Sequence, residues 1–347
     1  MKSLVVTTGK ERPIMDVWLP SLRDKGEYDG DVLIVDYFEG QALCKGMSYL
    51  LNSFSSESVE YLTSQKNVIY MKVHNVYSCV ASDRIRAFYE CLKPLWKQYD
   101  VILITDGNDI EFFKPIQPLL NMAETELCAV KEPLLHSIWS ACELVPKFPR
   151  NYWESIKEKA VLNAGIIAGS PNTIKPLLKF MIKNMKLYSD VFGSEQISLN
   201  IWFYHYKHFI RDVGCVWNCF INMGFKISYL VKVSGVPENF GLNLNGLVNS
   251  YIHNIYKLQY GEREKCILTT FDNSEIEVAI LHMHEDMKSQ FNPSHSDEPI
   301  FEGGQEYLAK VIILFDLKLD KFNLSTDQKL KVKAYYEQEI ENINYNR

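Results

Sequence analysis

The chain has 347 residues, of which 47% are apolar and 23% are charged, the composition of a globular protein that can bury a sizeable core. A formal net charge of -6, with no long basic stretch, argues against general nucleic-acid binding. The eight cysteines are scattered without a Cys-x-x-Cys pair, which favours buried free thiols in a reducing compartment over zinc ligands. Because no apolar run is long enough for a signal peptide or for the ~20 residues that span a bilayer, we expect a cytoplasmic protein without a transmembrane segment.

The apolar pattern predicts strands that alternate with helices. Strands are expected at residues 4–8, 32–35, 67–72, 101–104, 127–131, 161–170 and 277–281. Helices are expected at residues 14–22, 42–51, 82–98, 174–185, 195–208 and 330–340. This alternation indicates an α/β fold, with a mainly parallel central sheet flanked by helices on both faces.

No linker, internal repeat or low-complexity segment divides the chain. We therefore expect one domain over residues 1–300 and a helical C-terminal extension over residues 301–347. The charged helix expected at residues 330–340 has weak apolar periodicity, which fits a helix that packs on that domain or joins a homodimer.

An acidic turn follows the most apolar of the expected strands. The aliphatic run over residues 101–104 is typical of a strand buried on both faces of a parallel sheet, and Asp106, Asn108 and Asp109 follow it around a glycine. Ligands of open α/β sheets bind beyond the carboxyl ends of the strands, where carboxylates can hold a divalent cation and the phosphates that it bridges. The alternative is structural, because Asp and Asn after a strand commonly form Asx-turns or cap a helix.

Two further groups could complete a phosphate-binding site. His282 ends the late expected strand, and an imidazole suits the coordination shell of manganese. Arg84 and Arg86 lie on the helix before the acidic strand. They are two residues apart and cannot share one helix face, so at most one of them can point at phosphates while the other is solvated or ion-paired.

Two polar motifs suit sugar hydroxyls. Asn163 stands in an Asn-Ala-Gly segment, and Glu195 and Gln196 stand at the start of an expected helix. An amide offers a donor and an acceptor to a sugar. Glu195 and Gln196 are equally compatible with helix capping.

The order of these motifs resembles that of metal-dependent glycosyltransferases of the GT-A fold, especially the glycogenin and lipopolysaccharide galactosyltransferase group and a related set with a Thr-Asp-x-x-Asp turn. The resemblance covers roughly residues 4–288. Five short motifs carry it: Asp83-Arg84-Ile-Arg86-Ala-Phe88, Asp106-Gly-Asn-Asp109, Leu162-Asn163-Ala-Gly165, Glu195-Gln196-Ile-Ser-Leu199-Asn200, and His282 with Lys288 six residues later. The acidic turn has one more residue than the family pattern, and His284-Glu285-Asp286 stands where the family has a glycine between its His and Lys.

The resemblance implies a GT-A (Rossmann-like) hexosyl- or pentosyltransferase that moves a sugar from a nucleotide-diphosphate donor, with a UDP-sugar favoured, to a glycan or other hydroxyl acceptor with retention of configuration. The implied ligands of Mn²⁺ or Mg²⁺ are Asp109 and His282, with Asp106, Asn108 or both beside them. The residues implied at the nucleotide and diphosphate are Thr7, Thr8, Asp106, Asn108, Lys288 and one of Arg84 and Arg86. The residues implied near the transferred sugar are Gln196, Glu195 and Asn163.

Other functions stay open on the sequence. Glu195 or Glu132 could serve as the base of an inverting enzyme. A sugar-phosphate nucleotidyltransferase would share the fold and the metal chemistry, although residues 7–12 are a poor version of its glycine-rich and basic loop. The altered acidic turn also suits a non-catalytic nucleotide-sugar-binding protein.

Overall fold

The computed structural model describes residues 1–38, 40–44, 47–51, 53–77, 79–135, 149–157, 159–186, 193–214, 216–221, 266–269, 275–283 and five single positions between 326 and 337. Two units are distinguished: Met1–Cys219 with Ala279–His282, and Phe220–Val278 with Met283–Arg347. The expected boundary between residues 300 and 301 lies outside the described residues and stays a prediction.

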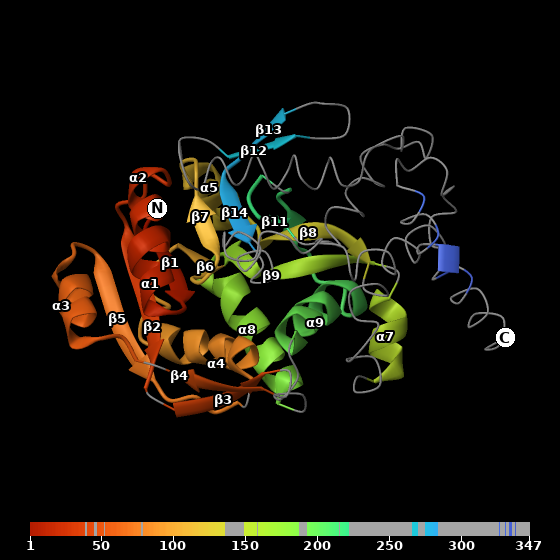
Figure 1. Ribbon diagram of the computed structural model, residues 1–347, viewed down its shortest axis with the longest axis horizontal. Helices are drawn as coiled ribbons and strands as arrows, with labels where there is room; N and C mark the ends of the chain where they lie inside the picture. Colours follow the sequence, from red (N-terminus) through yellow and green to blue (C-terminus); the bar gives the residue numbers. More distant parts are fainter. Residues whose placement is uncertain are drawn as a thin grey trace. The chain divides into compact units, whose positions relative to one another are not determined.

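A seven-stranded sheet of the order β10-β8-β9-β6-β1-β2-β5 forms the centre of the first unit (Figure 1). Its strands are β1 (Ser3–Thr8), β2 (Asp31–Tyr37), β5 (Val68–Val73), β6 (Val101–Asp106), β8 (Cys128–Leu135), β9 (Ala160–Gly169) and β10 (Arg211–Asp212). Parallel pairing joins β1 to β2 and β6, β2 to β5, and β8 to β10. Strand β9 is antiparallel to both of its neighbours, β6 and β8. The expected α/β fold with a mostly parallel central sheet is confirmed, and the reversed strand is an addition to it.

Helices cover both faces of this sheet. They are α1 (Glu11–Pro13), the π-helical η1 (Ile14–Trp18), α2 (Leu19–Asp24), α3 (Ser56–Ser64), α4 (Val80–Leu92), α5 (Gln117–Thr125), α7 (Arg150–Ile156), α8 (Pro171–Met185), α9 (Ser194–Asn200) and the π-helical η3 (Ile201–His205). On one face α4, α8 and α9 bury Phe88, Leu178 and Leu199 against the sheet. On the other face η1, α2, α3 and α5 bury side chains such as Trp18 and Leu119. The central strands are therefore apolar toward both faces, as β6 shows with Val101 to Ile104 no more than 2% exposed.

Two of the sequence expectations in this unit are wrong. The helix expected at residues 42–51 is a hairpin of β3 (Gly40–Cys44) and β4 (Met47–Leu51), which pair antiparallel. Its second half has apolar residues at alternate positions and a glycine before it, which are strand and turn signals. The helix expected at residues 82–98 ends at Leu92 as α4. Lys93 still has helical φ and ψ, but Pro94 has no backbone N–H with which to continue the helical hydrogen bonds.

Smaller sheets carry the remaining strands. One has the order β11-β14-β7, with β7 (Ile110–Phe112), β11 (Cys219–Ile221) and β14 (Ile280–Met283). In the second unit β12 (Cys266–Thr269) pairs antiparallel with β13 (Glu275–Val278). The strand expected at residues 277–281 is thus divided between β13 and β14. Within the helix expected at residues 330–340, the four described positions are helical and exposed.

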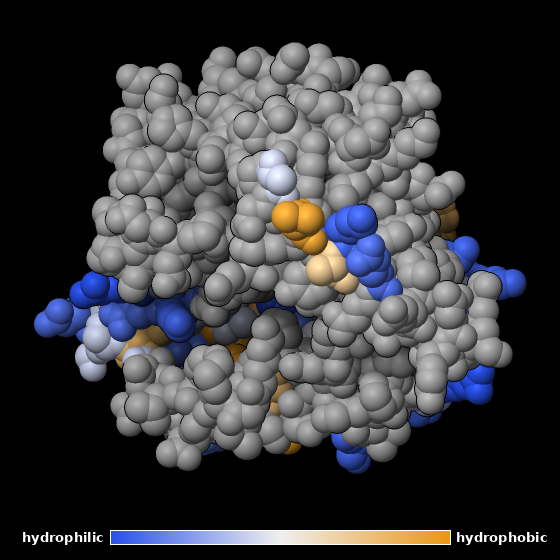
Figure 2. Space-filling model, turned by 45° about the vertical axis from the view of Figure 1, so that its right-hand side comes forward, coloured by the Kyte–Doolittle hydropathy of each residue, from blue (hydrophilic) through white to orange (hydrophobic). Residues whose placement is uncertain are grey.

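Among the described residues, no helix is long and apolar enough to cross a membrane. Cys79, Cys91 and Cys128 are buried free thiols. Most of the described side chains that Figure 2 shows at the surface are hydrophilic, with small hydrophobic areas between them.

Candidate metal centre

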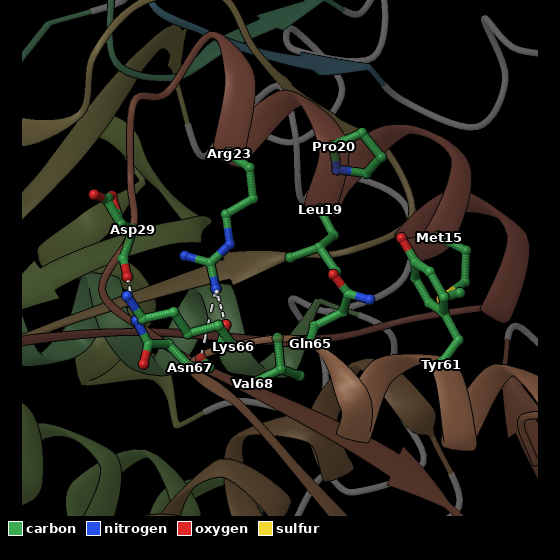
Figure 3. A pocket seen from close by; sticks show the side chains of 10 residues that line it. All are labelled: Met15, Leu19, Pro20, Arg23, Asp29, Tyr61, Gln65, Lys66, Asn67 and Val68. Atoms are coloured by element: carbon green, nitrogen blue, oxygen red, sulfur yellow. Dashed lines mark hydrogen bonds between the residues drawn. The ribbon is translucent and has the colours of Figure 1, made fainter.

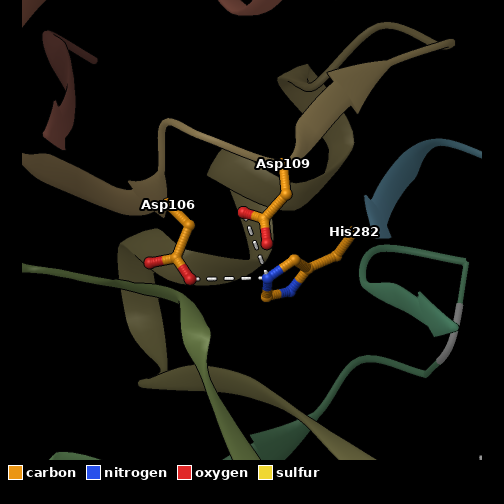
Figure 4. A group of neighbouring side chains, drawn as sticks. All are labelled: Asp106, Asp109 and His282. Atoms are coloured by element: carbon orange, nitrogen blue, oxygen red, sulfur yellow. Dashed lines mark ion pairs between the residues drawn. The ribbon is translucent and has the colours of Figure 1, made fainter. Parts of the chain in front are cut away.

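Asp106, Asp109 and His282 converge at the carboxyl end of β6 (Figure 4). One ligand atom from each lies within 4.8 Å of the other two. The Nε2 atom of His282 is 3.4 Å from Oδ2 of Asp106 and 3.6 Å from Oδ1 of Asp109. Two ligand atoms that are each about 2.1 Å from a shared ion are about 3.0 Å apart at a right angle and about 3.4 Å apart at a tetrahedral angle. The spacing therefore fits a divalent cation shared by two carboxylates and one imidazole.

Backbone geometry places the two carboxylates. Asp106 is the last residue of β6 and lies opposite Thr8 of β1, and Asp109 directly precedes β7. The amide of Gly107 donates to the carbonyl of Thr8 at 3.1 Å, and a side chain on Gly107 would approach the Thr7 hydroxyl and the Thr8 carbonyl to 2.7 Å. Glycine is therefore required at the centre of this turn.

Asn108 takes part in the turn in another way. Its Oδ1 atom accepts a hydrogen bond from the backbone N–H of Lys10 at 2.6 Å, which ties the acidic turn to the loop after β1. Asn108 therefore has a structural role through a long-range hydrogen bond, which is not an Asx-turn, while Asp106 and Asp109 both face His282.

Antiparallel pairing of β14 with β7 places His282 beside the acidic turn. His282 lies opposite Ile110, the residue after Asp109, so the imidazole reaches the acidic turn from the neighbouring strand. His282 is 3% exposed, and its Nδ1 atom is 3.0 Å from Oδ1 of Asn218. Asn218 in turn donates through Nδ2 to Oδ1 of Asn163 at 2.9 Å. Asn163, which was expected near the transferred sugar, thus lies behind the histidine.

Arg84 joins this centre to a buried carboxylate. One terminal nitrogen of Arg84 is paired with Oδ1 of Asp106, and the other is 3.8 Å from Oε1 of Glu195. Burial raises the pKa of Glu195 above its ordinary value, and the guanidinium of Arg84 acts in the opposite direction. Glu195 Oε2 and Arg84 Nε are buried without a hydrogen-bond partner among the described residues. Such atoms mark a place where a ligand can supply the missing hydrogen bonds.

The second arginine is directed elsewhere. Arg86 makes a bidentate pair with Asp83 at 2.7 Å and donates to the carbonyl of His74 at 2.6 Å. The hydrogen bonds that Arg86 donates to Asp83 stabilise the charged guanidinium and raise the pKa of Arg86. Asp83 also accepts hydrogen bonds from the backbone amides of Val76 and Tyr77, so this pair holds the loop before α4. Of the two arginines, Arg84 contacts the acidic turn and Arg86 does not.

The other expected site residues have the following positions. Thr7 is buried and donates its hydroxyl to the carbonyl of Thr105 at 3.1 Å, and Thr8 ends β1 beside Asp106. Gln196 accepts a hydrogen bond from the amide of Ala164 at 3.1 Å, which fixes it against β9. Lys288 lies outside the described residues, as does the side chain of Glu132.

Sequence reasoning missed Asn218 and the steric role of Gly165. Asn218 lies in a stretch without apolar periodicity, so no local signal pointed to it. Gly165 belongs to the Asn-Ala-Gly motif, but its contact with His282 depends on the pairing of distant strands.

A separate hollow of about 410 Å³ lies near the first residues of β2 and β5, the opposite end of the strands from Asp106 (Figure 3). Arg23 points into it toward the segment of Lys66 and Asn67. Its guanidinium donates to the carbonyls of Tyr28 at 2.6 Å and Gly30 at 2.9 Å, so it serves loop packing. We assign no ligand to this hollow.

No protein-family model matches the chain, and no curated protein matches its sequence.

Proposed function

We propose that this protein is a metal-dependent glycosyltransferase that moves a sugar from a nucleotide-diphosphate donor to a hydroxyl group of a glycan or another acceptor. A UDP-sugar is the first donor to test. The observation that carries the proposal is the convergence of Asp106, Asp109 and His282 at the carboxyl edge of a mostly parallel sheet. Support from the sequence comes from the GT-A-like order of motifs, in which these three residues take the metal positions.

The donor set fits Mn²⁺ or Mg²⁺. Two carboxylate oxygens offer hard ligands with two negative charges, and the imidazole nitrogen adds a borderline ligand. Three protein ligands leave positions open for diphosphate oxygens and water. A bound cation would act there as a Lewis acid that neutralises the charge developing on the departing diphosphate.

The chain's own residues supply the rest of the proposed chemistry. Arg84 contacts both Asp106 and Glu195, and its Nε–H, for which the described part of the chain offers no hydrogen-bond partner, can donate to a phosphate oxygen. Oε2 of Glu195, which has no hydrogen-bond partner within the described ranges, can accept a hydrogen bond from a sugar hydroxyl. Gln196, held by the amide of Ala164, lies beside Glu195 at the start of α9. We expect retention of configuration, as in the resembled group.

A thermal-shift screen of nucleoside diphosphates with and without Mn²⁺ tests the proposal first. A ligand that binds only the folded protein raises its stability by RT ln(1 + [L]/Kd), so the correct nucleotide stands out when Mn²⁺ is present. The nucleotide-sugar of that base is then offered with glycan acceptors, and NMR of the product gives its anomeric configuration. An inverted product overturns the expectation of retention.

Either of two results would assign a different function to the protein. Release of pyrophosphate from a nucleoside triphosphate and a sugar phosphate identifies a nucleotidyltransferase. Metal-dependent binding of a nucleotide-sugar, with neither hydrolysis nor transfer to any acceptor, identifies a binding protein.

A further inference from the structure

We propose that Asn163 and Asn218 are positioning residues that hold the neutral imidazole of His282 in the tautomer with its proton on Nδ1. This leaves the lone pair of Nε2 directed at the carboxylates of Asp106 and Asp109. The purpose assigned to this arrangement, cation binding, rests on the proposed function, whereas the tautomer itself follows from the hydrogen bonds.

The direction of the hydrogen bonds begins at a group that can only donate. The backbone N–H of Gly165 lies 2.7 Å from the side-chain atom of Asn163 assigned as Oδ1. With the amide of Asn163 reversed, two donors would face each other, so this atom is the carbonyl oxygen. The backbone thus fixes the orientation of the first side-chain amide.

The same reasoning fixes the second amide and then the ring. Because Oδ1 of Asn163 is an acceptor, the atom of Asn218 that lies 2.9 Å from it must be the donor Nδ2. Oδ1 of Asn218 then faces Nδ1 of His282 at 3.0 Å, and it can only accept. The imidazole must therefore donate from Nδ1, and in the neutral ring Nε2 carries the lone pair.

Burial makes this direction costly to reverse. Asn163 and Asn218 are each 2% exposed and His282 is 3% exposed. If these hydrogen bonds ran in the opposite direction, two donors or two acceptors would face each other out of reach of solvent. A buried polar group that loses its hydrogen bond also loses the water that would replace it, which destabilises the reversed arrangement. The opposing influence is the pair of carboxylates, which would attract a proton on Nε2. Their oxygens lie 3.4 and 3.6 Å from Nε2, beyond the usual 2.7–3.2 Å of an N–H···O hydrogen bond, so that attraction is weakened.

Gly165 fixes the ring by its shape as well as by its amide. A Cβ atom at this position would lie 2.2 Å from Cε1 and 2.9 Å from Nδ1 of His282. The ring therefore packs directly on the backbone of β9, the same strand that carries Asn163. Steric contact sets the position of the imidazole, and the two asparagines set where its proton lies.

The tautomer can be measured directly on the chelator-treated full-length protein labelled with ¹⁵N-histidine. Long-range ¹H–¹⁵N correlation spectra at alkaline pH distinguish the two neutral forms, and loss of one signal set in His282→Gln gives the assignment. We expect the Nδ1–H form in the unsubstituted protein. Asn218→Leu, which removes the acceptor at similar size, should move the population toward Nε2–H and weaken Mn²⁺ binding by about 10–100-fold, the usual effect of losing a partner of a ligating histidine.

Two variants separate this role from a merely structural one. Asn163→Asp keeps an oxygen that accepts from both Gly165 and Asn218, so the Nδ1–H form should persist. Asn184→Leu makes the same change as Asn218→Leu at a half-buried asparagine of α8 that donates to Ser198, and it should leave both the tautomer and the Mn²⁺ affinity unchanged.

An Nε2–H ring in the unsubstituted protein overturns the inference, whether or not any variant folds. An unchanged tautomer in folded Asn218→Leu overturns it as well. If the Nδ1–H form is present and moves in Asn218→Leu but the protein binds no Mn²⁺, the role of the asparagines stands and the proposed function alone fails.

Discussion

Asp109→Asn is the substitution that tests the metal centre most sharply, because it keeps the shape of the side chain and removes one of two negative charges. Two unit charges about 4 Å apart attract by about 4 kcal/mol at an effective dielectric constant of ~20. The charge of a divalent ion increases this attraction, and solvent reduces it at a side chain that is 14% exposed. We expect a net loss of about 3 kcal/mol in the binding of Mn²⁺, which is about a hundredfold in Kd.

The assay is thermal unfolding over a titration of Mn²⁺. At a concentration of about 100 times the Kd, the ion stabilises the unsubstituted protein by about 2.7 kcal/mol, and after a hundredfold loss in affinity it adds only about 0.4 kcal/mol. At about 2–4 °C for each kcal/mol, the Mn²⁺-dependent rise in Tm falls from about 5–10 °C to about 1 °C.

The matched control is Asp24→Asn, the same change at an exposed surface aspartate whose nearest cation, Lys25, is 3.8 Å away. It should keep the full Mn²⁺-dependent rise. If Asp109→Asn also keeps the rise, the proposed metal role is refuted. If it lowers Tm equally with chelator and with Mn²⁺, the residue serves the turn and not a cation.

Three further changes have expected outcomes. Gly165→Ala should weaken Mn²⁺ binding at least tenfold in a titration followed by the EPR signal of free Mn²⁺, because the new methyl group displaces the ring of His282. Burial raises the pKa of Glu195 from its ordinary value of 4.5, so the folded state holds this proton more tightly than the unfolded state, and stability falls as pH rises from about that value through the folded pKa. Glu195→Gln removes this loss and should raise Tm at neutral pH, with the gain shrinking as pH is lowered toward 4.5. Burial raises the pKa values of Cys91 and Cys128 to about 11, so iodoacetamide at neutral pH should modify them only after denaturation, as read by mass spectrometry of peptides.

Each of these expectations has a control and a contrary result. Gly169→Ala lies on the same strand as Gly165, and its methyl group would meet the movable side-chain ends of Thr173 and Leu127, so Mn²⁺ affinity should be retained. Glu124→Gln makes an equivalent change at an exposed position and should leave the pH dependence of Tm unchanged. Rapid alkylation of either cysteine in the native protein contradicts its burial.

Local pattern was enough to predict most of the central sheet. Strands β1, β2 and β6 were expected within a few residues of their observed bounds, because strands buried on both faces are nearly continuous apolar runs. The edge strand β5 was expected equally closely, although its residues are only partly buried or exposed. The direction of β9 was not predicted, since the apolar run of a strand is the same in either orientation. Residues 42–51 were misassigned because a short apolar stretch fits a helix and a hairpin alike until its turn is recognised.

The candidate site was predictable where one residue type implied one chemistry. Carboxylates at the end of a buried strand predicted the position of Asp106 and Asp109, and the spacing of Arg84 and Arg86 predicted that at most one of them faces phosphates. Asn218 was beyond prediction, because its role exists only when β14 lies beside β7 and β9 runs in reverse.

The reversed direction of β9 explains how the two halves of the site come together. Since β9 is antiparallel to β6, it begins at the edge of the sheet where β6 ends, and this brings Asn163 and Gly165 behind His282. The first residues of β9 are also hydrogen-bonded to α9. Asn200 accepts from the amide of Leu162 at 2.7 Å and donates to the carbonyl of Leu162 at 2.9 Å. Helix α9 starts with the residues that include Glu195. A parallel strand at this position would begin at the far edge of the sheet, so the reversal is what lets one short segment hold both the imidazole and the helix that carries the buried carboxylate.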